Sequence, residues 1–214
     1  MTEIRICFVG DSITVGTGDE DYQGWPGRVC NREAAKGHDV TLYNLGIRAN
    51  TSNDISMRWR AECEARMPEG ANCALVFSFG VNDAAEEVGS GVRVPLEQSL
   101  ANAAAMMEEA KSWLPSLWIG PPPVVEEMMP VTPGTGAVYN FDNPRTKALS
   151  EAYKSLALEL GIPYLDVFDT LAADERWTRA QQKSDGIHAM GEGYERMADL
   201  IGAWNAWRSW FDGP

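Results

Sequence analysis

The sequence lacks several features that would define a class of protein. None of its apolar runs approaches the ~20 residues that a helix needs to cross a bilayer, so a transmembrane helix is not expected. Basic residues are few: 18 Lys and Arg stand against 31 Asp and Glu, a formal net charge of −13 over 214 residues. Because such a chain repels phosphates, we expect it to bind neither nucleic acid nor an anionic membrane surface.

Cysteine is also scarce. The four cysteines form no CxxC pair and no zinc-type spacing, and they are Cys7, Cys30, Cys63 and Cys73. This pattern predicts free thiols in a reducing compartment. Residues 1–10 lack the basic start and apolar core of a secretory leader, so we expect a cytoplasmic protein. We predict no metal and no cofactor.

Common enzyme motifs are missing as well. The sequence has no GxSxG, no HExxH and no GxxxxGK[ST], which argues against an α/β-hydrolase elbow, a zincin and a P-loop. Gly16-Thr17-Gly18 leaves open a flavodoxin-like nucleotide- or flavin-binding module. However, the dinucleotide pattern GxGxxG fails at Asp21, and the acidic residues 19–21 would repel a phosphate.

Short apolar runs alternate with longer helical patterns. The predicted strands are Ile4–Val9, Val40–Leu45, Ala74–Phe79, Leu117–Gly120 and Tyr164–Phe168. The predicted helices are Trp25–Lys36, Asp54–Met67, Leu96–Trp113, Pro144–Leu160 and Gly191–Trp210. Nearly continuous apolar strands indicate a parallel sheet that is covered on both faces. We therefore predict an α/β fold with three α/β/α layers and a five-stranded parallel sheet. Without a repeat or a linker, residues 1–214 are predicted to form one domain.

Two connections, 81–94 and 121–141, are long for this type of fold. The second contains three consecutive prolines and then Met128, Met129, Val131, Tyr139 and Phe141. These side chains can either form a wall facing a substrate or pack on the edge of the domain. In the last predicted helix, an apolar stripe at helical spacing predicts a core contact or a homo-oligomer interface, and it comprises Tyr194, Met197, Ile201, Trp204 and Trp207.

In open α/β sheets, ligands bind outside the carboxyl ends of the strands. In this sequence, polar segments follow the first three predicted strands at that end. They are Gly10–Thr14, Asn44–Gly46 and Gly80–Asp83, and a fourth, Asp185–His188, precedes the last helix. We expect all four to meet at one edge of the sheet.

Together these segments contain the groups needed for acyl transfer. Ser12 supplies a hydroxyl, His188 a base to accept its proton, and Asp185 a carboxylate to orient the imidazole. Donors for an oxyanion can come from the N–H groups of Ser12 and Gly46 and from the side-chain amide of Asn82.

The other histidine, His38, is placed too far away to serve as the base. It precedes the second predicted strand and so lies at the amino edge of the sheet, whereas Ser12 follows the first strand at the carboxyl edge. Strands of this length separate the two edges by ~20 Å.

With these residues, the sequence resembles the SGNH hydrolase superfamily, the GDSL-type lipases and esterases. The four family blocks match in order as Gly10-Asp11-Ser12, Gly46, Gly80-Val81-Asn82-Asp83 and Asp185-Gly186-Ile187-His188. The resemblance implies a three-layer fold, metal-independent ester hydrolysis, and a triad of Ser12, Asp185 and His188. It also implies an oxyanion hole from Ser12, Gly46 and Asn82, and a structural role for Asp11. The sequence departs from the family at Arg48 and Asn50, where small residues are common.

The apolar and aromatic side chains of 121–141 favour a substrate with a short-to-medium acyl or aryl ester. A carbohydrate O-acetylesterase is the alternative among hydrolases.

Overall fold

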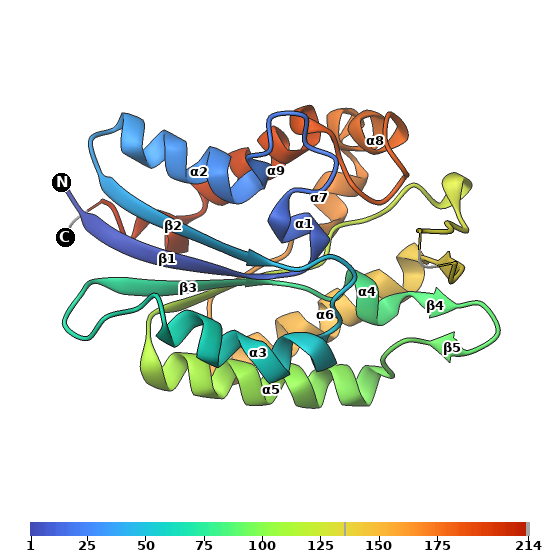
Figure 1. Cartoon of the computed structure of the whole chain (residues 1–214), viewed down its shortest axis with the longest axis horizontal. Coiled ribbons are helices and arrows are strands. Elements are labelled where there is room, and N and C mark those ends of the chain that lie inside the picture. Colours follow the sequence, from blue (N-terminus) through green and yellow to red (C-terminus); the bar gives the residue numbers. More distant parts are fainter. Residues whose placement is uncertain (135, 213–214) are drawn as a thin grey trace.

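A five-stranded parallel sheet forms the centre of the computed structural model, which describes residues 1–134 and 136–212 (Figure 1). The strand order is β2-β1-β3-β6-β8. The strands are β1 (Glu3–Gly10), β2 (Asp39–Gly46), β3 (Cys73–Ser78), β6 (Ser116–Ile119) and β8 (Tyr164–Leu165). All four pairings between them are parallel, as predicted.

Helices cover both faces of this sheet (Figure 1). One face carries α2 (Gly24–Ala35), α7 (Phe168–Ala172), α8 (Glu175–Gln182) and α9 (Gly191–Ala203). The other face carries α3 (Ser52–Glu64), α5 (Leu96–Trp113) and α6 (Asn143–Leu160). A short helix, α10 (Asn205–Arg208), follows α9. The predicted three-layer α/β/α fold is confirmed.

Strand β1 lies between two hydrophobic cores, which explains its continuous apolar sequence. Ile6 and Phe8 belong to the core under α2 and α9, whereas Cys7 and Val9 belong to the core under α3 and α5. Successive side chains of a strand point to opposite faces, so a strand covered on both sides needs apolar residues at every position.

The C-terminal third differs from the prediction in three places. The last strand ends at Leu165 rather than Phe168, because the Asp166 side chain accepts a hydrogen bond from the Phe168 N–H at 3.2 Å and α7 begins there. The predicted helix 191–210 breaks at Trp204, whose backbone is extended. Helix α8, with its N-cap at Asp174, was not predicted.

The break at Trp204 allows the following turn to reach the core. Trp207 is fully buried, and its ring packs 6.3 Å from that of Phe8. Its indole N–H donates to the buried Glu33 carboxylate of α2 at 3.2 Å. Tyr194, Met197 and Ile201 are also fully buried, so most of the predicted apolar stripe forms core contacts.

The two long connections contain a second, smaller sheet. Its antiparallel strands are β4 (Glu86–Glu87), β5 (Gly91–Val92) and β7 (Tyr139–Asn140), in the order β5-β4-β7. A 3₁₀ turn, η1 (Glu126–Met128), precedes β7 in the second connection. Segments 81–94 and 121–141 were predicted as long connections without strands, but they pair with each other at the carboxyl edge of the main sheet (Figure 1).

All four cysteines are buried and free, as predicted. Within residues 1–134 and 136–212, no helix combines the length and the apolar composition that crossing a membrane requires.

Candidate active site

Three side chains from remote parts of the chain meet at the carboxyl edge of the sheet. The Oγ of Ser12 lies 2.7 Å from Nε2 of His188, and Nδ1 of His188 lies 2.7 Å from Oδ2 of Asp185. Ser12 and His188 are 5% and 8% exposed, so their contact is shielded from bulk water. The arrangement can transfer a proton from the hydroxyl to a ring that a carboxylate orients.

The loop that carries His188 is held by Asp185 itself. Oδ1 of Asp185 accepts the backbone N–H groups of Ile187 and His188 at 3.0 and 2.8 Å. Partial burial opposes ionisation of Asp185, but the hydrogen bond and the charge of His188 outweigh it and lower the pKa to about 2. Asp185 is therefore an anion at neutral pH.

Ser12 begins the short helix α1 (Ser12–Val15), which follows β1 directly. Asp11 caps this helix, since its Oδ1 accepts the Ile13 N–H at 2.9 Å. The preceding residue must be glycine, because a Cβ at Gly10 would lie 2.1 Å from the Ser78 carbonyl oxygen of the adjacent strand β3. These contacts fix where Ser12 leaves the sheet.

Asn82 lies on the next short helix, α4 (Val81–Ala84), after β3. Its side-chain nitrogen donates to the Asn50 carbonyl at 3.1 Å and to Oδ2 of Asp11 at 3.3 Å. Asn82 and Ser12 both line the same cavity. The sequence prediction that these two positions converge is met in the structure.

The structure does not bring Gly46 into this group. Its N–H already donates to Oδ1 of Asn44 at 3.0 Å, and Gly46 does not border the cavity that contains Ser12. A Cβ at this position would lie 2.4 Å from the Val15 nitrogen and 2.6 Å from the Asp11 carbonyl oxygen. Glycine is needed here because α1 packs directly on the end of β2, and the expectation that Gly46 donates to a ligand is corrected.

Ala49, rather than Gly46, lies beside Ser12 and Asn82. It borders the cavity with Ser12 and Asn82, and its backbone has a φ of 63°. Among the hydrogen bonds of the described residues, none uses the Ala49 N–H. No sequence signal marks this position, since alanine seldom adopts a positive φ.

The cavity beside Ser12 and His188 has a volume of about 530 Å³. Val131, Tyr139 and Phe141 form part of its wall, so these three residues follow the first of the two alternatives that the sequence left open. Met128 and Met129 instead pack against Gly186, next to Asp185. The wall also contains two arginines that the sequence analysis did not select as site residues, Arg48 and Arg93.

These observations agree with a comparison of the sequence with known families. The sequence model of the GDSL-like lipase/acylhydrolase family matches residues 8–196. The chain belongs to this family. It is therefore a GDSL-type carboxylic ester hydrolase, as the resemblance implied. A comparison with curated proteins gave no significant sequence match.

Solved structures of several lipases and esterases share this fold. The lipase/acylhydrolase from Enterococcus faecalis is 24% identical, covers 97% of each chain and superposes with a TM-score of 0.75. Axe2, an acetylxylan esterase from Geobacillus stearothermophilus, is 18% identical over 97% of this chain and 98% of its own, with a TM-score of 0.69. The psychrotrophic esterase EstA from Pseudoalteromonas is 14% identical over 98% and 99% of the two chains, with a TM-score of 0.66.

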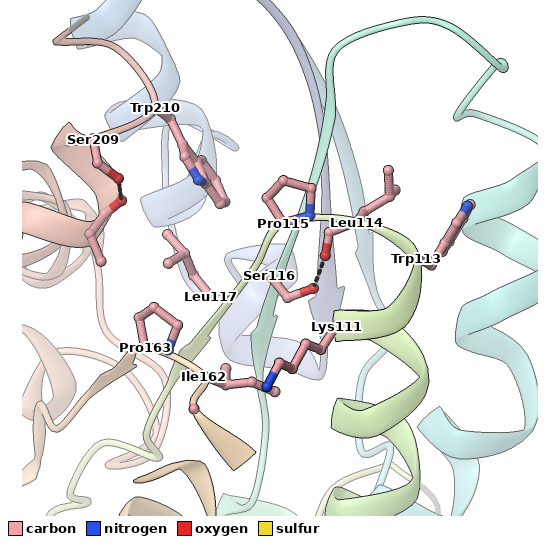
Figure 2. Close-up of a pocket in the computed structure, with 12 residues that line it drawn as sticks. Lys111, Trp113, Leu114, Pro115, Ser116, Leu117, Ile162, Pro163, Ser209 and Trp210 are labelled. Carbon is pink, nitrogen blue, oxygen red and sulfur yellow. Dashed lines mark hydrogen bonds between the residues drawn. The ribbon is translucent and has the colours of Figure 1, made fainter. Parts of the chain in front are cut away.

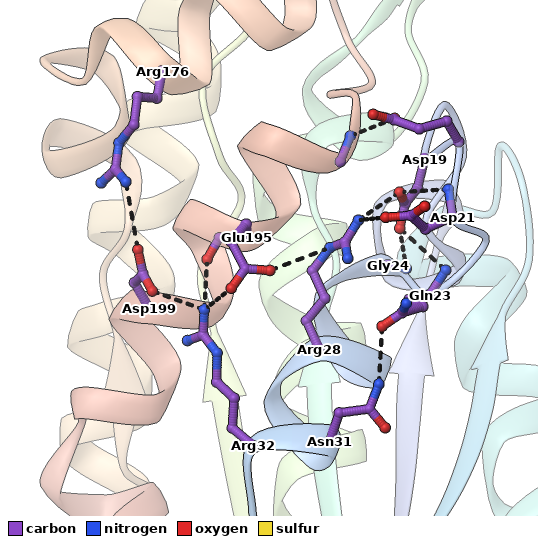
Figure 3. Close-up of polar contacts among 12 residues, drawn as sticks. Asp19, Asp21, Gln23, Gly24, Arg28, Asn31, Arg32, Arg176, Glu195 and Asp199 are labelled. Carbon is purple, nitrogen blue, oxygen red and sulfur yellow. Dashed lines mark hydrogen bonds and ion pairs between the residues drawn. The ribbon is translucent and has the colours of Figure 1, made fainter. Parts of the chain in front are cut away.

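In this GDSL hydrolase, an ion-pair network joins the loop after Ser12 to the helix after His188. Figure 3 shows Arg28 of α2 between Asp19 and Glu195 of α9. Arg28 donates to the buried Asp19 at 2.7 Å, and its Nε lies 3.7 Å from the Glu195 carboxylate. Glu20 accepts the N–H of Gly191, the first residue of α9, at 2.8 Å. These contacts tie the segment that follows Ser12 to the helix that follows His188, through residues that do not line the cavity.

The same turn bears on the nucleotide-binding alternative. The Asp19 carboxylate accepts the backbone N–H groups of Asp21, Gln23 and Gly24 at 3.1, 3.1 and 2.7 Å. A phosphate at this GDSL hydrolase's glycine turn would need such donors, but a carboxylate of the protein already occupies them. The family assignment and this turn both favour the hydrolase over the flavodoxin-like module.

Two further residues lie away from the site, and for His38 the sequence predicted this. His38 accepts the Thr2 N–H at 3.2 Å, at the amino edge of the sheet. Trp25 is fully buried and packs edge-on against Phe8, so it belongs to the core rather than to the cavity wall.

A second cleft, of about 500 Å³, lies at the amino ends of β6 and β8 (Figure 2). Its hydroxyl groups, Ser116 and Ser209, both donate to backbone carbonyls, those of Leu114 and Ala206. Lys111 is the ionisable side chain on its wall, and it donates to the Leu160 carbonyl. Among the described residues that line this cleft, none has an imidazole or a carboxylate, so they offer no base for acyl transfer.

Proposed function

We propose that this GDSL hydrolase cleaves carboxylic esters through a covalent acyl-enzyme formed on Ser12. The observation that carries the proposal is the chain of two 2.7 Å contacts from Ser12 through His188 to Asp185. His188 accepts the hydroxyl proton as Oγ attacks the ester carbonyl, and then donates it to the departing alcohol. A water molecule, activated by the same ring, releases the acid.

Asp185 supports both steps. Its carboxylate accepts a hydrogen bond from the N–H at Nδ1 of His188. The unprotonated Nε2 then faces Ser12 and can accept its proton. When the ring becomes positively charged, the same carboxylate stabilises it. The low pKa of Asp185 keeps this charge in place at neutral pH.

The oxyanion hole is proposed to consist of the Ser12 N–H, the Ala49 N–H and the side-chain amide of Asn82. Ser12 is the first residue of α1, where the N–H has no partner within the helix. The Asn82 nitrogen makes its longer hydrogen bond, 3.3 Å, to Asp11, and an oxyanion would compete for that hydrogen. Ala49 takes the role expected of Gly46, because it borders the cavity and its N–H makes no hydrogen bond among the described residues.

The preferred substrate is proposed to carry a short-to-medium acyl or an aryl group. Val131, Tyr139 and Phe141 line the cavity of about 530 Å³ beside Ser12, and apolar walls bind such groups by excluding water. Sugar acetates are the competing substrates, and Axe2, which shares the fold, is named as an acetylxylan esterase.

Hydrolysis of p-nitrophenyl acetate tests the mechanism. The wild type should turn over this ester, and Ser12→Ala should abolish turnover while leaving the thermal unfolding transition in place. Added chelator should not change the rate, because each proposed step uses only side chains and backbone amides. A Ser12→Ala variant with wild-type turnover would refute the covalent mechanism.

A panel of substrates tests the specificity. Nitrophenyl esters of increasing acyl length, an aryl acetate and acetylated sugars should be compared by kcat/KM. We expect the acyl and aryl esters to be preferred, and a strong preference for acetylated sugars would overturn the specificity but not the mechanism.

A further inference from the structure

Arg93 is presented to the cavity by the small second sheet. It follows β5 directly, and its own N–H donates to the Ala85 carbonyl at 2.9 Å. The next N–H, that of Val94, donates to the Asp83 carbonyl at 3.2 Å. Arg93 therefore extends from a backbone that is anchored on both sides to the helix bearing Asn82.

The guanidinium group of Arg93 donates to an oxygen atom of each of two residues that supply donors to the proposed oxyanion hole. Nη1 donates to Oδ1 of Asn82 at 3.1 Å, and Nη2 donates to the Ala49 carbonyl at 2.8 Å. Its central carbon lies 5.1 Å from the ring centroid of Tyr139 on β7. None of the ion pairs among the described residues involves Arg93, and its side-chain hydrogen bonds go to these two neutral oxygens.

The contact with Asn82 decides which way its carboxamide faces. A guanidinium group has only donors, so it can bind the oxygen of the carboxamide but not the nitrogen. The nitrogen must then face the opposite side, where Asp11, the residue before Ser12, accepts from it. The charged donor also polarises the amide, which strengthens the hydrogen bonds that its N–H groups donate.

The contact with Ala49 holds the second proposed donor. The backbone of Ala49 has a φ of 63°, a conformation that an L-residue adopts only when its surroundings impose it. By binding the Ala49 carbonyl, Arg93 restrains this conformation and with it the direction of the Ala49 N–H. One side chain thus joins two donors that come from different segments, the Ala49 loop and helix α4.

We propose that Arg93 is a positioning residue for the oxyanion hole of this enzyme. It acts through Asn82 and Ala49 rather than by contact with the reacting atoms, and the proposal rests on the ester-hydrolase mechanism above. An oxyanion hole binds the transition state more strongly than the substrate, so loss of Arg93 should lower kcat and leave KM nearly unchanged.

The first measurement compares Arg93→Met and Arg93→Lys with the wild type on p-nitrophenyl acetate. We expect Arg93→Met to lower kcat by roughly 10- to 100-fold, the range that small misplacements of catalytic groups produce. Lysine keeps the charge but lacks the planar fork that reaches two oxygens at once, so Arg93→Lys should remain clearly impaired. Thermal unfolding checks that each variant is folded. If Arg93→Met does not fold, Arg93→Lys decides, and wild-type kcat in that variant would overturn the proposal.

The second measurement asks whether Arg93 acts through Asn82. Asn82→Ala alone should lower kcat by roughly 10²–10³-fold. In the Asn82→Ala background, Arg93→Met should have a much smaller effect than in the wild type, because one of its two targets is gone. Fully multiplicative effects, or a rise in KM with unchanged kcat, would show that Arg93 does not position Asn82.

The Ser12→Ala control separates the two proposals. If Ser12→Ala keeps wild-type turnover, the ester-hydrolase mechanism itself fails. If Ser12→Ala is inactive while Arg93→Met has wild-type kcat, the mechanism stands and only the role of Arg93 is wrong.

Discussion

The carboxylate of Asp11 lies 3.3 Å from the side-chain nitrogen of Asn82, and both side chains are buried. Asp11 also caps the helix that begins with Ser12, through a 2.9 Å bond from the Ile13 N–H. One acidic side chain therefore contacts both the segment with the nucleophile and the amide proposed to bind the oxyanion. Burial of this acid has a measurable consequence.

The free energy of unfolding should depend on pH through Asp11. Burial raises its pKa to about 6 from 3.8, although bonds from backbone amides and the charge of His188 oppose the change. A raised carboxyl pKa means that the folded state binds the proton more tightly, so this contribution to stability is complete below about pH 4 and is lost as the pH rises through 6. The loss amounts to at most about 3 kcal/mol, from 1.36 kcal/mol per pH unit.

Urea denaturation of the wild type and Asp11→Asn between pH 4 and 7 measures this contribution. The stability of the wild type should fall relative to that of the variant as the pH rises. A difference that stays constant over this range would contradict the raised pKa of Asp11.

Asp185→Asn should lower kcat by roughly 10²–10⁴-fold, because an amide cannot hold His188 in the required tautomer or stabilise its positive charge. The lowered pKa of Asp185, about 2, gives the opposite pH dependence from that of Asp11. Its contribution to stability is present above pH 4 and is lost as the pH falls towards 2. Stability curves of the wild type and Asp185→Asn should therefore converge at acidic pH. Equal activity of the two proteins at neutral pH would remove Asp185 from the mechanism.

Ala49→Gly should stabilise the fold. A left-handed backbone costs an L-residue about 1–2 kcal/mol, and glycine avoids this cost but loses more conformational entropy on folding. We expect a net gain of up to about 1 kcal/mol in the free energy of unfolding. Ala49→Val, which adds a branched Cβ at the same φ, should change the stability in the opposite direction. A destabilised Ala49→Gly would show that the backbone at this position is not strained.

Asp19→Ala should destabilise the protein strongly. Its buried carboxylate accepts hydrogen bonds from Arg28 and from three backbone N–H groups, and removal of one partner of a buried pair costs about 3–5 kcal/mol. The matched control is Asp169→Ala, which breaks the exposed pair with Lys147 and should have little measurable effect. Chemical denaturation of both variants tests the contrast, and similar losses in the two would contradict the role of burial.

The sequence predicted those parts of the fold and site that depend on short-range patterns. Continuous apolar runs such as that of β1 identified the buried parallel strands, and polar residues after them identified Ser12, Asn82 and the segment Asp185–His188. Their convergence followed from a general property of parallel sheets, since all carboxyl ends share one edge. The number of histidines then left His188 as the base.

The parts that the sequence did not predict depend on contacts between distant segments. Glycine at position 46 was interpreted as a ligand-binding backbone, but close packing of α1 on β2 requires it. Ala49 has a positive φ that only its surroundings impose, and Arg93 follows a two-residue strand too short to give a periodic pattern. The predicted single domain, the cytoplasmic location and a homo-oligomer stay predictions.

The pairing of β4 with both β5 and β7 also matters for engineering. Strand β4 of segment 81–94 forms backbone hydrogen bonds with β7 of segment 121–141. Replacing only one of these segments with that of another enzyme would therefore leave a strand edge with unsatisfied hydrogen bonds beside the catalytic groups. Chimeras designed to alter selectivity should therefore exchange segments 81–94 and 121–141 together.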